Sequence, residues 1–282
     1  MEAKRYLQEV GAQVSDDFVK NRSILSLEEY LTLFSAEPRR QARNAAQYLR
    51  DVLEHYGTET VAHPTGKLRR FKLFDVPSSD RDGRVAGQEE VQNAVYRMLG
   101  NFTRAGRINK LIMLHGPNGS AKSTFVNALK VGLEDYSRQS EGALYSISWI
   151  FPSSKLVKGS IGFGGERIPA PEGDLTSFAH LDAESIDVRI PCELRDPPLF
   201  VLPPAERQRF IDGALKKKGD GPAAAPGDGD FTLSDYVRHG ELCHKCRSIY
   251  TALLANYKGD FMQVVRHVRV ERYYVSRRYQ VG

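Results

Sequence analysis

Two groups of residues in this sequence have the types and spacing for chemistry, and the first is the stretch "HGPNGSAKST". Gly116, Lys122 and Ser123 stand at the spacing of a phosphate-binding loop, Gly-x-x-x-x-Gly-Lys-Ser/Thr, which joins a strand to a helix. In such a loop backbone N–H groups surround an anion, the lysine reaches the β- and γ-phosphates, and the serine hydroxyl ligates Mg²⁺. We therefore expect a nucleotide site formed by Gly116, Pro117, Asn118, Gly119, Ser120, Ala121, Lys122, Ser123 and Thr124.

Ala121 stands where the phosphate-loop pattern has a glycine. We expect this residue to begin the helix with ordinary backbone angles, where a methyl group costs little and the N–H group is retained. An eight-position pattern with one mismatch can also arise by chance. The setting favours the functional interpretation, because "KLIMLHG" is an apolar run typical of a strand buried in a parallel sheet, and "STFVNALKVGL" is amphipathic and helical.

The phosphate loop lacks an identified catalytic partner. Hydrolysis would need an acidic residue at the end of a second apolar strand, to hold the metal and orient water. Asp182 and Glu184 are acidic, but "LTSFAHLDAESI" resembles a capped helix more than a buried strand. The chain ends on "RRYQVG", interpreted as part of a strand, and we expect the missing acid beyond Gly282. The catalytic residues are therefore unknown.

The second group is a set of three cysteines. Cys243 and Cys246 form a Cys-x-x-Cys pair, a spacing that lets one turn present two thiolates to a tetrahedral metal, and Cys192 lies about fifty residues earlier. A structural Zn²⁺ would need a fourth ligand, for which the candidates in this sequence are His180, His239 and His244. The alternatives are partly buried reduced cysteines that act as small hydrophobic residues, and a redox-active pair.

The remaining pattern predicts an α/β protein. Apolar spacing predicts helices over residues 26–34, 45–56 and 87–106, the first with a capping box formed by Ser26 and Glu29, and a second strand over residues 143–151. Residues 158–174 are rich in glycine and proline and predict a loop, and residues 216–230 are of low complexity and predict disorder.

Composition places the chain among ordinary globular proteins. It has 282 residues, of which 41% are hydrophobic, and a formal net charge of +5. This excess is too small for a dedicated nucleic-acid surface, although "RHVRVERYYVSRRY" mixes arginines with tyrosines, so we do not expect a nucleic-acid partner. No apolar run is long enough to span a membrane and the first residues do not form a signal peptide, so we expect no membrane partner and a cytoplasmic location.

The sequence resembles the PrkA family, bacterial proteins described as serine protein kinases with an AAA+ module. The similarity rests on "SLEEYLTLF", on "FKLFDVPSSDRDGRVAGQEEVQNAV", on the phosphate loop, and on the segment from "GELCHKCRS" to the last residue. It implies a P-loop NTPase (AAA+) fold with a parallel sheet and flanking helices over residues 61–282, after a helical segment over residues 1–60. It also implies ATP and Mg²⁺ as cofactors, a protein substrate, and a homo-oligomer.

The resemblance leaves the activity open. It implies a serine/threonine protein kinase, but the sequence has no "HRD" and no "DFG", so the catalytic groups of eukaryotic-type kinases cannot be assigned. One alternative is an AAA+ ATPase that remodels or degrades proteins without kinase activity. Another is a metal-stabilised nucleotide-binding scaffold without turnover.

Overall fold

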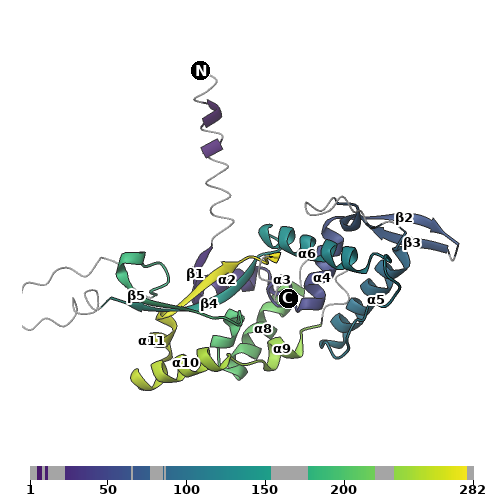
Figure 1. Ribbon diagram of the computed structural model, residues 1–282. Coiled ribbons are helices and arrows are strands. Elements are labelled where there is room, and N and C mark those ends of the chain that lie inside the picture. The colour runs from purple at the N-terminus through teal and green to yellow at the C-terminus, as the bar shows by residue number, and fades with distance from the viewer. Residues whose placement is uncertain are drawn as a thin grey trace, which may run out of the picture. The chain divides into compact units, whose positions relative to one another are not determined.

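The computed structural model describes residues 5–7, 10–11, 23–64, 66–76, 85, 87–153, 177–219 and 232–277 (Figure 1). The chain divides into two compact units, each built from segments that are distant in the sequence. We call the first the sheet unit: it comprises Met1–Ala36, Leu144–Arg207 and Glu241–Tyr273. We call the second the helical unit: it comprises Glu37–Ala143, Gln208–Gly240 and Tyr274–Gly282.

The sheet unit is built on a four-stranded antiparallel sheet. Its strands, in the order β1-β6-β4-β5, are β1 (Ile24–Ser26), β6 (Val268–Tyr273), β4 (Leu144–Pro152) and β5 (Ile186–Pro191). Figure 1 shows β4 and β6 side by side, and Ile147 of β4 pairs with Val270 of β6. The middle five residues of β4 are all buried, so this strand is covered on both faces.

Short helices complete the sheet unit. They are α2 (Leu27–Ala36), α10 (His244–Asn256), α11 (Phe261–Arg266), and the 3₁₀ turns η2 (Ala183–Ser185) and η3 (Pro198–Val201). The predicted capping box of α2 is confirmed: Ser26 N–H donates to Glu29 Oε2 at 2.8 Å, and Glu29 N–H donates to Ser26 Oγ at 3.1 Å. Helix α2 packs against β1, β6 and η3, which places its apolar face on the core.

The helical unit contains a hairpin and several helices. They are α3 (Pro38–Gln41), α4 (Ala45–His55), the hairpin β2 (Thr58–His63) and β3 (Gly66–Phe71), η1 (Lys72–Asp75), α5 (Glu89–Ala105), α6 (Lys122–Arg138) and α9 (Asp235–His239). The helix α8 (Pro204–Gly219) begins in the sheet unit and continues in the helical unit. In the core, the rings of Phe74 and Phe125 stack at 4.5 Å between centroids. The predicted helices over residues 45–56 and 87–106 are confirmed as α4 and α5.

The predicted parallel sheet of an AAA+ P-loop NTPase is wrong. Every strand pair among the described residues is antiparallel, in the four-stranded sheet and in the β2–β3 hairpin. The predicted strand over residues 143–151 exists as β4. A buried apolar pattern indicates that both faces of a strand are covered, but it does not determine whether the neighbouring strands run parallel or antiparallel to it. The fold is α/β with antiparallel sheets.

The predicted strand in "KLIMLHG" is also wrong for the described structure. Residues 109–117 belong to no helix or strand, and the side chains of Leu111 and Met113 are 79% and 76% exposed. An apolar run forms a buried strand only where neighbouring strands supply hydrogen bonds and cover its faces. The run lacks such neighbours among the residues that the structure describes.

Two other local predictions change. "LTSFAHLDAESI" forms no α-helix over residues 177–186: it consists of turns, the short 3₁₀ turn η2 and the start of β5. Residues 216–219, expected to be disordered, continue α8. The strand expected at "RRYQVG" lies, apart from Arg277, outside the described residues. The predicted loop over residues 158–174 and the rest of the low-complexity segment lie outside the described residues.

Candidate functional site

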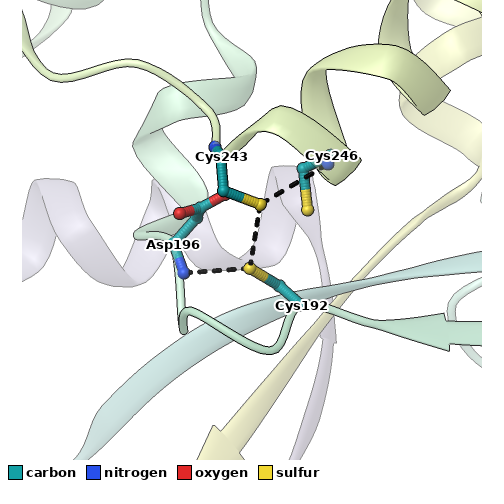
Figure 2. A group of neighbouring side chains, drawn as sticks. All are labelled: Cys192, Asp196, Cys243 and Cys246. Carbon is teal, nitrogen blue, oxygen red and sulfur yellow. Dashed lines mark hydrogen bonds between the residues drawn. The ribbon is translucent and has the colours of Figure 1, made fainter.

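The three cysteines come together in the sheet unit with an aspartate. Cys192, Cys243 and Cys246 contribute their sulfur atoms and Asp196 a carboxylate oxygen, and these four atoms all lie within 4.8 Å of one another (Figure 2). Three sulfurs and one oxygen at this spacing are a ligand set that could hold a metal ion. The sequence predicted the three cysteines as one group, and the structure brings them together.

One half of the cluster comes from the turn that follows β5. The N–H group of Cys192 donates to Ile147 O at 2.9 Å, which continues the β5–β4 ladder by one residue and fixes the position of this cysteine. Arg195 then adopts a left-handed conformation with φ 57°, which is uncommon for a residue with a side chain. The turn brings Asp196 back toward the strand, where its N–H group donates to Cys192 Sγ at 3.2 Å.

The other half comes from the start of α10. Cys243 is the N-cap residue of this helix, and its sulfur accepts a hydrogen bond from Cys246 N–H at 3.5 Å. The backbone N–H of Cys243 donates to Asp196 Oδ2 at 2.8 Å, which joins the two halves. Figure 2 shows Cys192 and Cys243 with their sulfurs directed at each other, at 3.9 Å. Two thiolates on one tetrahedral zinc lie about 3.8 Å apart, because each Zn–S bond is about 2.3 Å long. The observed distance fits that geometry.

Burial controls the chemistry of the thiols. Cys192 and Cys246 are each 1% exposed, and burial raises the pKa of both thiols above the ordinary cysteine range. Without a metal, both groups are therefore protonated near neutral pH. Because a metal binds the thiolate, binding would release these protons.

A cation lies near the rim of the cluster. Lys245 Nζ donates to Glu193 Oε1 at 2.8 Å, and this hydrogen bond, together with the charge of Glu193, raises the pKa of Lys245. Lys245 is exposed, so water screens its charge. It offsets only part of the negative charge that three thiolates and a carboxylate would carry.

Asp196 is the ligand that the sequence did not identify. None of the three expected histidines joins the cluster: His180 Nε2 lies 2.6 Å from Glu29 Oε2, His244 is exposed at the first position of α10, and His239 ends α9 in the helical unit. The available signal was the Cys-x-x-x-Asp spacing in "CELRD". Aspartate is so common on protein surfaces that this spacing alone is uninformative; its 3% exposure is what makes Asp196 unusual.

The predicted phosphate loop lies in the helical unit and leads into α6. Gly119 has φ 82° and Ala121 has φ 59°, so two nearby residues are left-handed. The expectation of ordinary backbone angles at Ala121 is wrong. A residue with a side chain in this region costs of order 1 kcal/mol or more, because its Cβ crowds the following carbonyl. The first helical hydrogen bond, from Phe125 N–H to Ala121 O at 2.8 Å, begins immediately after this strained residue.

The ammonium group of Lys122 folds over the loop. Lys122 Nζ donates to Gly116 O at 2.8 Å, to Pro117 O at 2.7 Å and to Ser120 Oγ at 3.1 Å. A Cβ at position 116 would lie 2.9 Å from Ser120 Oγ, so a larger residue there would displace this hydroxyl from its contact with Lys122. The lysine and the loop carbonyls thus form one hydrogen-bonded group. Ser123, the next residue in the sequence, is exposed.

A cavity of about 340 Å³ adjoins the loop within the helical unit. It is lined by side chains of α5, including Val91 and Met98, by Phe125 of α6, and by the loop residues Pro117 and Lys122. Its wall is mostly apolar, and the lysine brings a positive charge to the loop side. A cavity with an apolar wall and a cationic group suits a ligand that has an apolar ring and an anionic group.

The acidic candidates Asp182 and Glu184 lie in the sheet unit at η2, where both side chains are exposed. They are not part of a helix longer than this turn. Their assignment as metal-site acids stays a prediction.

No protein-family model, curated protein or solved structure matches the chain. Within the described ranges, none of the helices is both long enough and apolar enough to cross a membrane.

Proposed function

We propose that residues 116–124 bind the phosphate groups of ATP with Mg²⁺. The observation that carries this proposal is the loop itself: a glycine-rich turn with two left-handed residues precedes a 17-residue helix, and its lysine ammonium is folded onto it. The N–H groups of a helix's first turn have no partner within the helix, so they suit an anion. Strain at Ala121 also supports a functional role, because such strain concentrates at ligand sites.

Each residue of the loop would contact a different part of Mg-ATP. The Lys122 ammonium would exchange its contacts with the loop carbonyls for contacts with phosphate oxygens, and the Ser123 hydroxyl would ligate Mg²⁺. Bound Mg²⁺ would neutralise part of the triphosphate charge. The adjoining apolar cavity would take the base, whose faces are apolar.

A binding titration tests the proposal. Lys122→Ala should weaken the binding of Mg-ATP by at least about tenfold, since it removes a charge that phosphate contacts directly. Lys110→Ala is the matched control, because it removes an exposed lysine just before the loop and should change affinity much less. Equal losses of affinity in both variants would mean that Lys122 acts only through general electrostatic attraction. No loss in either variant would refute the phosphate site at residues 116–124.

The resemblance to the PrkA family supports a further step, transfer of the γ-phosphate to a serine or threonine of a protein substrate. The alternative is an ATPase that acts on proteins without phosphorylating them. Labelled γ-phosphate distinguishes the two: the first activity puts label on protein, and the second releases only free phosphate. A scaffold without turnover would do neither while still binding ATP.

A second proposal concerns the cysteine cluster, which we propose binds one structural Zn²⁺. The specific observation is the set of three sulfurs and one buried carboxylate whose ligand atoms lie within 4.8 Å of one another, with the sulfurs of Cys192 and Cys243 at 3.9 Å. With four protein ligands no coordination position is left for a substrate, which favours a structural role.

Metal analysis of purified protein should find about one zinc per chain, and Cys246→Ser should abolish zinc binding. Asp196→Asn keeps the acceptor for the Cys243 N–H group but removes the charge, so it should bind zinc more weakly. A native protein with only traces of zinc that fails to take up added zinc would refute this site.

A further inference from the structure

Trp149 lies on the sheet face that carries the cysteine cluster. It is the single tryptophan of the chain, and its side chain is 0% exposed. Trp149 pairs with Ile190 across the β4–β5 ladder, and the hydrogen bond from Cys192 N–H to Ile147 O places Cys192 opposite Ile147. Because side chains alternate along a strand, Ile147, Trp149 and Cys192 project from the same face.

The indole N–H group of Trp149 is a buried donor without a conventional partner. It makes no hydrogen bond of ordinary geometry among the described residues. A buried N–H group without an acceptor is costly, so such groups are rare in proteins. Its side chain interacts with that of Cys246, whose sulfur belongs to the cluster.

The other two sulfurs of the cluster each have an N–H donor. Cys192 Sγ accepts from Asp196 N–H at 3.2 Å, and Cys243 Sγ accepts from Cys246 N–H at 3.5 Å. No backbone donor of this kind is present for Cys246 Sγ among the described contacts. The indole of Trp149 is the group in place to supply it.

We propose that Trp149 is a positioning residue of the metal site, whose indole N–H donates a hydrogen bond to the metal-bound thiolate of Cys246. This inference rests on the proposed zinc site. A neutral thiol is a weak acceptor, whereas a thiolate is a strong one, so the hydrogen bond strengthens when metal binds. Three N–H donors, one for each sulfur, would then stabilise a set of ligands with four negative charges against the two positive charges of the ion.

The single tryptophan permits a test that changes only this donor. In a tryptophan-auxotrophic host, Trp149 can be replaced by β-(3-benzothienyl)alanine, in which a sulfur atom takes the place of the indole N–H group and the ring shape is kept. The probe is Co²⁺, because a thiolate bound to Co²⁺ gives a charge-transfer band. The native protein should bind one Co²⁺ per chain with the band intensity of three thiolates.

The substituted protein should bind Co²⁺ about 10- to 100-fold more weakly, the usual effect of removing a group that hydrogen-bonds a metal ligand. Its charge-transfer band should move to longer wavelength, since a thiolate without the hydrogen bond gives up its electron more easily. Trp149→Phe should move the band in the same direction. Ile150→Val is the packing control: it alters a buried side chain on the opposite face of β4 and should leave the band in place.

The outcomes separate the two ideas. A native protein without the three-thiolate band would refute the zinc site and this inference with it. A native protein with the band, together with a substituted protein of equal affinity and equal band position, would overturn the role of Trp149 and leave the zinc site standing. A shift that Ile150→Val reproduces would also overturn it, because the shift would then follow from packing.

Discussion

The cysteine cluster and the phosphate loop are organised in opposite ways. The loop is a single run of residues, and its turn is set by local backbone angles such as the left-handed φ of Gly119 and Ala121. The cluster joins two short turns whose sulfurs are 51 residues apart in the sequence, and it depends on β4, β5 and α10 to bring them together. The cluster should therefore respond to changes across the sheet unit, whereas the loop should respond mainly to changes within it.

Metal removal should have the largest effect and should test this contrast most directly. A ligand that binds only the folded state stabilises it by about 4 kcal/mol when its free concentration is about a thousand times its dissociation constant. Chelation should therefore lower the free energy of unfolding of the sheet unit by several kcal/mol. Hydrogen exchange should show lost protection in β4 and α10, with little change in α5 and α6. Equal loss in all four elements would show that the two units unfold together and would break the comparison.

Gly142→Ala should have the next largest effect, and it should act on the helical unit. A Cβ at Gly142 would lie 1.9 Å from the backbone oxygen of Tyr136, and Gly142 O accepts a buried hydrogen bond from Tyr48 at 2.8 Å. The backbone must shift, so we expect a loss of about 3 kcal/mol in urea unfolding, the upper part of the usual range for overpacking. Metal affinity should be unchanged.

Gly213→Ala is the control for that variant. It adds a Cβ in α8 with nothing within 4 Å, and it should stabilise the protein by about 0.5–1 kcal/mol because alanine is the better helix former. A loss of stability in Gly213→Ala would show that the effect at Gly142 is not specific to its contact with Tyr136.

Ala121→Gly should have a smaller effect of the opposite sign. Glycine adopts the left-handed region without a Cβ conflict, so the substitution should stabilise the protein by about 0.5–1 kcal/mol after the greater flexibility of the unfolded chain is taken into account. Ala128→Gly, in the interior of α6, should instead cost about 1 kcal/mol. Thermal unfolding measures both. A loss at both positions would mean that Ala121 is not left-handed in solution.

The contrast between the two regions also explains what the sequence could predict. The capping box of α2, the helices α4 and α5, and the strand β4 follow from local patterns, and all were predicted. The three cysteines could be grouped because Cys-x-x-Cys is a spacing found in metal sites, although the sequence also allowed reduced buried cysteines or a redox pair. Asp196 was missed because only its burial, a result of the strained turn at Arg195, distinguishes it from surface aspartates.

The errors in the predicted strands have one physical cause. The apolar residues of β4 and of "KLIMLHG" carry the same pattern, yet β4 is the covered strand and Leu111 is 79% exposed. An apolar pattern shows that a segment would be stabilised by burial. Whether it is buried depends on which distant segments of the chain pack against it. For the same reason the pattern could not show that the strands run antiparallel. The error at Ala121 has a separate, local cause: this residue precedes α6 and does not share its helical angles.

His267 offers the smallest effect, a pH dependence that should be confined to the sheet unit. Its ring is buried, and Nδ1 lies 2.7 Å from Ile150 O, which can only accept, so Nδ1 carries the proton and Nε2 accepts from the Tyr257 hydroxyl at 2.7 Å. Burial lowers the pKa of His267, the hydrogen bond to Ile150 O opposes this, and the charge of Arg266 lowers it further.

The unfolded chain therefore binds a proton at a higher pH than the folded protein does. Stability should be fully present above the ordinary histidine pKa of about 6.5 and should decrease as the pH falls from there toward the lowered pKa of the folded state. His267→Gln removes the titration while keeping a donor and an acceptor, so the difference in unfolding free energy between native protein and variant should shrink as the pH falls below about 6.5. The exposed His239 gives the control, since His239→Gln should leave the pH dependence of the sheet unit unchanged. A difference between native protein and His267→Gln that stays constant from about pH 7.5 to about pH 5 would contradict the neutral buried ring.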